Sequence, residues 1–458
     1  MQLGGAAERK RLLFFWAILP VFLLFPFTPF QAVAADQAPV ESAPFPLTGR
    51  LYTDQYMHVY YPDANTETFA QSSFTAWLEL STHEKESLNI HGIATETLFL
   101  KSLEYPETVR GQFNLREEYL SYANDWLEVK AGQQIIPWGK SDGINPTDYW
   151  TAKDYTVLNP DDEVKRTGAP AFSVSFTPDN GASPLTFTAI VQSSYAQAKL
   201  LIPDSAVPSV PVPFKKYPDS VSLFSGDTME YGGKVAYLQP KFDFSLSVFR
   251  GYAAMPHYEF DGSKIFATNA AELAIGGDLS FTLDSYIIRF ESALHMPDDG
   301  TQTDPYFGLV EPYHWDSVLG VERPVFTDFR IQIQGLYRYH LYYLSPDQFE
   351  SPNPMTTPIY QAVGRANALI LNYQDQSIFG GTFRFAYQPE NGDWTADLVF
   401  VGYVGSGSDF VTRPQVSYKP AEGFKLTAGA EIYGGDPNRP LSSNKNFSTV
   451  YFEGKWVF

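Results

Sequence analysis

The sequence predicts an all-β fold: a single antiparallel β-barrel that crosses a membrane with about eighteen strands. Three observations predict it. Apolar and polar residues alternate with a period of two along most of the chain. Short connections rich in turn residues alternate with long connections. The chain ends on the aromatic segment STVYFEGKWVF, whose last residue is Phe458.

The N-terminal residues predict export. Arg9, Lys10 and Arg11 precede the apolar stretch 12–30, and the following Ala-Val-Ala is a small-x-small cleavage site. An uncleaved membrane anchor is the alternative, but three prolines in the stretch disfavour it. Three parts are therefore expected in chain order: a cleaved signal peptide at 1–35, a periplasmic segment at 36–46 and the barrel at 47–458.

The alternation also predicts which side chains face lipid. In AELAIGGDLSFTL, Leu279 and Phe281 fall on the face opposite to Glu272 and Asp278. A membrane barrel turns its apolar face to lipid and its polar face to the lumen. The residues expected to face lipid are Leu279, Phe281, Ile331, Ile333, Phe383 and Phe385.

Counting the alternating segments gives the strand number. Strands are expected to start near residues 47, 69, 87, 111, 126, 170, 185, 228, 242, 271, 285, 314, 328, 376, 393, 409, 424 and 447. An even number places both barrel termini on the short-turn, periplasmic side. Two segments fit poorly: SLNIHGIATETLF has no clean face, and Glu117 falls on the outward face. Sixteen strands is therefore the alternative.

Composition and the chain end indicate the location and the partners. The net charge of −20 argues against nucleic acid as a partner, and the absence of cysteine excludes thiolate metal sites and covalent haem attachment. The terminal strand resembles the C-terminal signal that the barrel-assembly machinery reads, with Phe458 as its last residue. We expect a bacterial outer-membrane protein whose partners are membrane lipid and that machinery. A periplasmic partner remains an open question.

The segment PWGKSDGINPTDYW begins a long connection between the fifth and sixth expected strands. Its aromatic residues favour burial, and the nearest place to bury them is the lumen. Residues of about 137–169 are therefore expected to fold inward and narrow the pore. The residues expected at this constriction are Trp138, Lys140, Asp142, Asp148, Trp150, Lys153 and Asp154.

Two other interpretations of these charges stay open. The charged residues could only hold the loop, through internal salt bridges and Asx-turns. Asp142, Asp148 and Asp154 could also bind calcium, but their six-residue spacing is not that of an EF-hand. We expect no metal.

This region resembles a large group of Gram-negative outer-membrane barrels, in which a strand ending in G-x-Q is followed by W-G-x-x-D and then by N-P and D motifs. The resemblance covers about 30 residues and implies an outer-membrane location with passive or secretory passage. Barrels that export alginate-like polysaccharide are related in size. The matching residues are Gly132, Gln134, Trp138, Gly139, Lys140, Asp142, Asn145, Pro146, Asp148, Asn159, Pro160 and Asp161.

Charged residues also recur on the expected lumen face. They could form a basic ladder opposite acids, as in a selective pore, or simply pair with each other, because an unpaired charge away from water is costly. The basic set is Arg330, Arg338, Arg384, Arg413 and Lys425, and the acidic set is Glu272, Asp278, Glu291, Asp397 and Glu431.

The functional expectation is a porin-like channel for small polar or charged solutes. One alternative is an export barrel for an acidic polysaccharide, guided by the arginines. Another is a sheath around a partner complex such as a cytochrome conduit. An enzyme is not expected, since none of the seven histidines lies in a nucleophile motif and neither HExxH nor GxSxG occurs. No cofactor is expected.

Overall fold

The computed structural model describes residues 47–59, 69–82, 87–102, 108–203, 206–221, 228–298, 309, 311–351, 353–390 and 392–458. The expected signal peptide and the segment 36–46 lie outside the described residues. No helix in the described ranges is long and apolar enough to cross a membrane.

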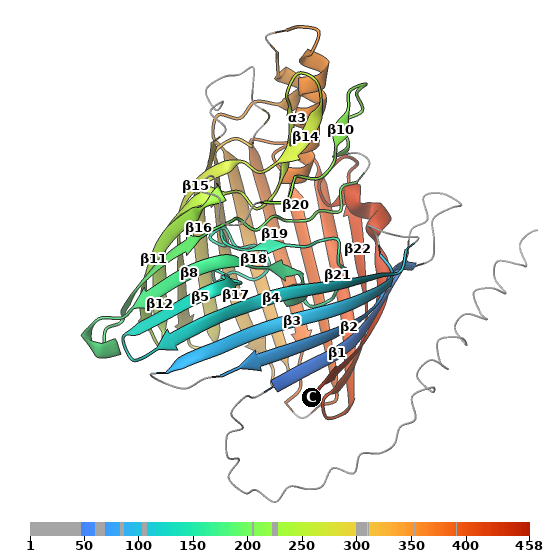
Figure 1. Cartoon of the computed structure of the whole chain (residues 1–458). Helices are drawn as coiled ribbons and strands as arrows, with labels where there is room; N and C mark the ends of the chain where they lie inside the picture. Colours follow the sequence, from blue (N-terminus) through green and yellow to red (C-terminus); the bar gives the residue numbers. More distant parts are fainter. Residues whose placement is uncertain are drawn as a thin grey trace, which may run out of the picture. The chain divides into compact units, whose positions relative to one another are not determined.

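Eighteen antiparallel strands form one closed sheet (Figure 1). Each pairs with the next along the chain, and the last pairs with the first, from Arg50 opposite Val457 to His58 opposite Thr449. The strands are β1 Leu47–His58, β2 Phe69–Ser81, β3 Leu88–Lys101, β4 Arg110–Ala123, β5 Leu127–Gln134, β8 Ala169–Phe176, β9 Leu185–Gln192, β11 Glu230–Gln239, β12 Phe242–Tyr252, β15 Ala271–Leu283, β16 Tyr286–Asp298, β17 His314–Val325, β18 Phe329–His340, β19 Ser377–Tyr387, β20 Trp394–Val404, β21 Ser408–Ala421, β22 Phe424–Gly435 and β23 Thr449–Val457.

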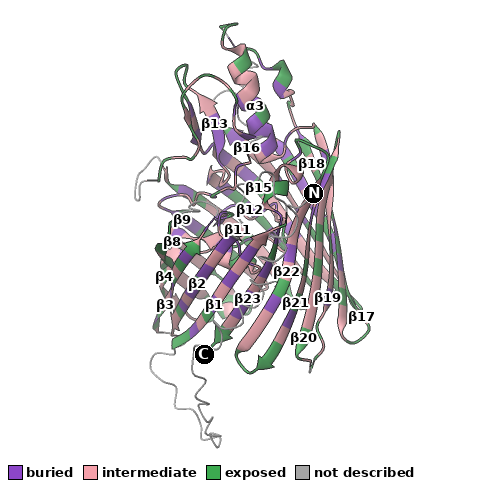
Figure 2. Cartoon of the chain, turned by 90° about the vertical axis from the view of Figure 1, so that its right-hand side faces the viewer, coloured by how far each residue is buried: buried purple, intermediate pink, exposed green. Residues whose placement is uncertain are grey.

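The predicted barrel and its eighteen strands are confirmed, and the sixteen-strand alternative is wrong. Burial alternates along the strands as the period-two pattern requires (Figure 2). Ile333 is 56% exposed on the outer face, whereas Gln332 and Gln334 on either side of it are buried. The apolar face of the strands therefore points outward, and the polar face lines the lumen.

A β-bulge explains why Glu117 did not fit the predicted pattern. The register between β3 and β4 shifts between Ile93 and Ala94, and Arg116 is the extra residue on β4. A bulge places two successive residues on one face. Arg116 is buried, and Glu117 lies 3.6 Å from His91 on β3. The expectation that Glu117 faces outward is wrong, because the bulge turns it into the lumen.

The long connections carry the remaining elements (Figure 1). The long connection after β5 holds two short strands and a short helix. Later connections hold a small sheet and a longer helix. The elements are β6 Ala152–Lys153, α2 Asp162–Lys165, β7 Arg166–Thr167, η1 Asp179–Gly181, β10 Phe214–Lys215, β13 His257–Phe260, β14 Ile265–Thr268, η4 Pro346–Gln348, α3 Thr357–Leu371 and η5 Ser442–Phe447.

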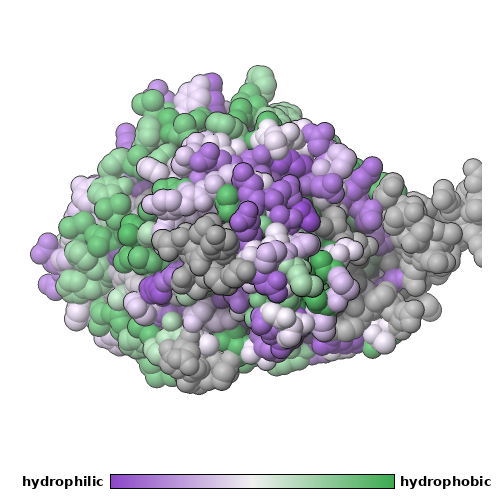
Figure 3. Space-filling model, turned by 90° about the horizontal axis from the view of Figure 1, so that it is seen from above, coloured by the Kyte–Doolittle hydropathy of each residue, from purple (hydrophilic) through white to green (hydrophobic). Residues whose placement is uncertain are grey.

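Helix α3 and the strands β10, β13 and β14 share a small apolar core above the barrel mouth. Val363 of α3 packs with Tyr258 of β13 and Ile265 of β14, all fully or almost fully buried. Asn367 accepts a hydrogen bond from the backbone N–H of Tyr258 and donates to the carbonyl oxygens of Tyr258 and Leu309. We call these packed connections the outer cap. Seen from this end, hydrophilic side chains gather near the middle and hydrophobic ones along much of the edge (Figure 3).

The sequence pattern predicts only long connections where the outer cap lies, without its helix and strands. Helix α3 does carry sequence signals: Pro358 stands in its first turn, and Ile359, Val363, Ala366 and Leu369 recur at helical spacing. Asn372 ends the helix in a left-handed conformation, with φ of 56°.

Candidate functional site

The connection between β5 and β8, residues 135–168, lies against the inward faces of strands far apart around the barrel. Near its start it contacts β11, β12, β15, β16 and β18. Near its end it contacts β1, β2 and β4. We call it the lumen loop. Because its two halves are tied to opposite parts of the wall, it crosses the lumen.

Aromatic packing anchors the first half of the lumen loop. Trp138, Tyr149 and Trp150 are buried in a cluster that includes Phe249 of β12. The ring centroids of Trp150 and Phe249 lie 4.9 Å apart, and those of Tyr149 and Phe249 lie 5.4 Å apart in a stacked pair. The two tryptophans expected in the constriction therefore pack against the wall and bury large apolar surfaces there.

Two wall glycines give these rings room. A Cβ on Gly276 of β15 would lie 2.4 Å from the hydroxyl oxygen of Tyr149. A Cβ on Gly232 of β11 would lie 3.0 Å from the ring of Trp150 and 2.4 Å from a backbone oxygen. A side chain at Gly276 would displace the Tyr149 ring, and one at Gly232 would clash first with the backbone of β12 and then with the Trp150 ring.

Glu291 of β16 binds the loop backbone. Its carboxylate accepts hydrogen bonds from the N–H groups of Lys140 and Ser141, at 2.9 and 3.0 Å, and from the N–H and hydroxyl of Thr147. Glu291 is fully buried. Gly139 has φ of 93°, and a Cβ there would lie 2.6 Å from a Glu291 oxygen. Only glycine allows this close approach.

The charged residues of the predicted constriction mostly hold the loop. Lys140 forms ion pairs with Asp243 of β12 and, at 2.8 Å, with Asp278 of β15. Asp142 accepts a hydrogen bond from Gln332 of β18. Both side chains therefore bind the wall, and Asp142 is also exposed and lines the cavity described below.

Asp148 and Asp154 make contacts mainly within the loop. Asp148 accepts hydrogen bonds from Thr151 at 2.7 Å and from Arg166 at 2.8 Å. Asp154 accepts from the N–H and the hydroxyl of Thr156 and pairs with Lys199 at 3.1 Å. These contacts match the interpretation in which the charged residues hold the loop through turns and internal salt bridges.

The second half of the loop is fixed to the opposite wall. Gln71 of β2 exchanges two hydrogen bonds with the backbone of Leu158, at 2.7 and 2.9 Å. Asn159 donates to Asp54 of β1 at 2.9 Å. Arg116, the bulge residue of β4, donates to backbone oxygens of the short helix α2.

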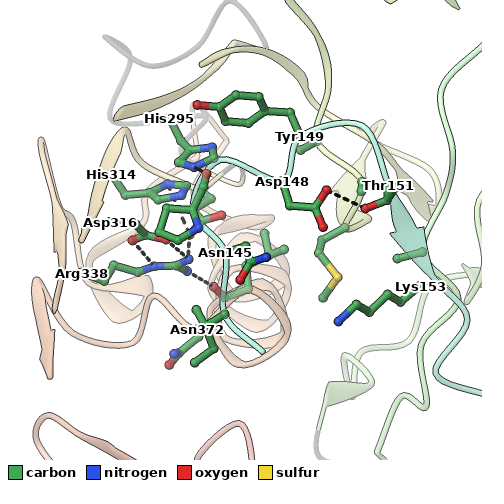
Figure 4. Close-up of a pocket in the computed structure, with 18 of the residues that line it drawn as sticks. Asn145, Asp148, Tyr149, Thr151, Lys153, His295, His314, Asp316, Arg338 and Asn372 are labelled. Carbon is green, nitrogen blue, oxygen red and sulfur yellow. Dashed lines mark hydrogen bonds and ion pairs between the residues drawn. The ribbon is translucent and has the colours of Figure 1, made fainter. Parts of the chain in front are cut away.

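A cavity of about 590 Å³ lies between the lumen loop, the barrel wall and the outer cap. His295, His314, Asp316 and Arg338 lie together on one side, and Asp148, Thr151 and Lys153 lie on the other (Figure 4). The cavity is a vestibule directly outside the lumen loop.

Lys153 stands out among the cations that line this vestibule. Arg166 and Arg338 are both ion-paired, whereas no hydrogen bond or ion pair within the described ranges involves the Lys153 ammonium group. Burial lowers the pKa of Lys153 below its usual value. Because it has no such partner in the described ranges, the Lys153 ammonium group, when protonated, can bind a solute in the vestibule.

The predicted basic ladder is paired almost throughout with acids close by in the wall. Arg384 forms two close contacts with Asp397, Arg413 lies 3.0 Å from Glu431, and Arg330 lies 3.4 Å from Glu322. Arg338 makes two hydrogen bonds with Asp316, at 2.6 and 2.7 Å. No ion pair of Lys425 occurs within the described ranges. The acids Asp397 and Glu431 thus neutralise their neighbours instead of facing them across the lumen.

The three other predicted acids act differently. Glu291 and Asp278 hold the lumen loop, as described, and Glu272 contacts His295. Sequence reasoning missed Glu311, which lies within 3.5 Å of His314, His340 and Arg338. Burial raises the pKa of Glu311, but neighbouring His314 and Arg338 and the contact with His340 together lower it to about 2.

One described group has metal-ligand composition: His295, His314 and Asp316, whose ligand atoms lie within 4.8 Å of one another. Both ring nitrogens of His295 are already hydrogen-bonded, and both oxygens of Asp316 are bound by Arg338. A cation would have to displace these contacts and to lie beside a guanidinium group. The arrangement does not fit a metal centre.

No protein-family model matches the chain, and no curated protein matches it. Solved structures do. OccAB3 of Acinetobacter baumannii has a TM-score of 0.52 at 9% identity, covering 91% of this chain and 99% of the other. The two chains share the same barrel fold. Pseudomonas aeruginosa OpdK, solved with vanillate, has a TM-score of 0.52 at 7% identity, covering 91% and 98%. A BenF-like porin from Pseudomonas fluorescens Pf-5 has 0.51 at 10%, covering 90% and 97%.

Proposed function

We propose that this protein is an outer-membrane channel that passes small polar or charged solutes. The observation that carries the proposal is the lumen loop. It is bound to both sides of the barrel wall and borders a polar vestibule of about 590 Å³. A pore that is narrowed but lined with polar and charged groups selects small hydrophilic solutes.

The outer surface supports the membrane location. Large apolar side chains are exposed around the strands, including Phe244, Leu246, Ile275, Leu319, Ile333 and Leu398. Such a surface would be unfavourable in water and is suited to lipid. The similarity to porins at about one tenth identity supports the fold, and the function rests on the site.

Lys153 supports a preference for solutes with a negative group. It lines the vestibule, it carries no ion pair in the described part of the chain, and the neighbouring Asp148 is held by Arg166. A charge that has no ion-pair partner in a narrow passage has a strong effect on ion selectivity.

The residues that resemble the motif of Gram-negative barrels have a structural role in this proposal. Gln134 bonds to the backbone of β8, Trp138 packs in the wall, and Asn159 binds β1. We infer that barrels with the strand-WGxxD and NP motifs share a loop fixed across the lumen in this way.

The two alternatives lack support of this kind. An export route for an acidic polysaccharide would need arginines whose charge is not already neutralised, but Arg330, Arg338, Arg384 and Arg413 are each paired with an acid. A sheath around a partner would need an open lumen, whereas the loop crosses it.

Planar-bilayer recording tests the proposal. The purified protein should form small, ion-selective channels whose reversal potential in a salt gradient shows a preference between anions and cations. Absence of conductance, both in the intact chain and after removal of residues 138–150, would contradict a channel function.

A further inference from the structure

A row of histidines crosses the wall of the vestibule. His295 of β16, His314 of β17 and His340 of β18 are directly paired in the strand register. The rings of His295 and His314 stack with centroids 4.7 Å apart. Those of His314 and His340 lie 5.8 Å apart. Because the pairing brings residues from three strands to one level, nothing in the local sequence around any one of them indicates the row.

His295 is the member of the row that touches the lumen loop. One ring nitrogen contacts the carboxylate of Glu272 on β15, and the other lies 3.0 Å from the carbonyl oxygen of Pro146. Carboxylate and carbonyl oxygens only accept hydrogen bonds. With a carboxylate at Glu272 and a carbonyl at Pro146, both ring nitrogens carry hydrogen, and the ring is an imidazolium.

We propose that His295 is a positioning residue that, when protonated, latches the lumen loop to the barrel wall and so makes the width of the pore depend on pH. The inference rests on the proposed channel function. It is independent of which solute passes.

The surroundings of His295 are consistent with a stable positive charge. Glu272 lies on β15 and Tyr149 on the loop, while β17 contributes Asp316 and the stacked His314. Arg338 of β18 opposes the charge, but Asp316 binds both ends of its guanidinium group. Its own strand supplies Glu291, which is occupied by loop donors. The carboxylates of Glu272 and Asp316 thus lie near the ring, and the one nearby cation, Arg338, is itself paired with Asp316.

Loss of the proton breaks one of the two contacts. A neutral ring has one nitrogen with a lone pair, which must then face an oxygen of either Glu272 or Pro146. Thr147, the next residue, stays bound to Glu291, so the loop should loosen near Pro146 instead of leaving the wall entirely. A charged hydrogen bond of this kind is strong enough to change the open fraction of the loop about tenfold.

Conductance against pH tests the proposal. In the unmodified chain, the open fraction should rise as the pH is raised from about 5 to about 10, a range that contains histidine titration. His295→Gln cannot titrate and should remove this rise. Glu272→Gln should shift its midpoint to lower pH, because the carboxylate stabilises the protonated ring.

His91→Gln is the matched control. His91 also faces the lumen and pairs with a carboxylate, that of Glu117 at 3.6 Å. It lies on β3, and Glu117 meets the lumen loop at Ile135, eleven residues before Pro146. Its pH profile should equal that of the unmodified chain. A rise that persists in His295→Gln, or one that disappears equally in His91→Gln, would overturn the latch.

A second measurement separates failure of the latch from failure of the channel. The chain has no cysteine, so Ile144→Cys accepts a single nitroxide label on the loop, two residues before Pro146. Label mobility should increase with pH in the unmodified background and not in His295→Gln, whether or not current flows. Unchanged mobility contradicts the proposal. The label could also be immobilised by zinc at a low zinc concentration, only when His295 is present. That outcome would overturn the latch and make the row a metal site.

Discussion

Glu291 accepts two hydrogen bonds from Thr147, one from its backbone N–H at 2.8 Å and one from its hydroxyl at 2.9 Å. The two residues lie 144 positions apart in the sequence. Glu291 is fully buried. A buried carboxylate with several donors is a strong attachment, because its charge is compensated by hydrogen bonds and not by water. The position of the lumen loop depends on it.

Glu291→Gln should loosen the lumen loop. An amide presents an NH₂ group to backbone donors that need an acceptor, and each unsatisfied buried group costs about 1–3 kcal/mol. Single-channel recordings should show larger or more frequently fluctuating currents. Glu128→Gln is the control, since Glu128 is half-exposed and pairs with Lys130 on its own strand. Identical recordings from both variants would contradict the role of Glu291.

Removing residues 138–150 should widen the pore. The deleted segment contains the aromatic anchors and the ligands of Glu291, while the paired strands of the barrel stay intact. Single-channel conductance should increase. Vesicles that contain the same protein preparation should also take up solutes faster. A folded deletion variant with unchanged conductance would show that the loop does not limit passage.

Lys153→Gln should shift ion selectivity toward cations. Lys153 is charged at low pH, and burial lowers its pKa, so the unmodified channel should itself lose anion preference as pH rises, starting below the usual titration of lysine. Reversal potentials in a salt gradient measure both effects. Lys199→Gln is the control, because Lys199 is half-exposed and already paired with Asp154.

Ile333→Arg should destabilise the folded barrel by about 2–4 kcal/mol if the position lies near the membrane midplane. Ile333 is exposed on the outer face. Equilibrium refolding into lipid vesicles measures the free energy of unfolding. Arg330→Gln is the control, because Arg330 lies on the lumen side of the same strand and is mostly exposed there. This substitution should change the free energy of unfolding by no more than about 0.5 kcal/mol. Equal stability of the two variants would refute the assigned faces.

Gly132→Ala should disturb the end of β5, where the lumen loop begins. Gly132 has φ of 136°, and a Cβ there would lie 2.1 Å from the carbonyl oxygen of Glu118. The cost should exceed about 1 kcal/mol. Gly92→Ala on β3 has no atom within 4 Å of its new Cβ and should be nearly neutral in the same refolding measurement.

The barrel could be predicted from local sequence pattern. Period two places alternate side chains on opposite faces of any strand, so lipid-facing residues such as Ile333 and the strand number follow from local pattern. The one wrong face, at Glu117, arose because a bulge adds a residue without a signal in the alternation. Helix α3 was missed although its spacing was visible.

The tertiary structure decided what the polar residues do. Whether Arg384 guides a solute or neutralises Asp397 depends on which residues the strand register places side by side. Lys140 and Asp142 bind the wall because β12, β15 and β18 meet the loop there. The row of His295, His314 and His340 exists only through pairing across three strands. Charges act over a few ångströms, and those distances are set by closure of the barrel rather than by neighbours in the chain.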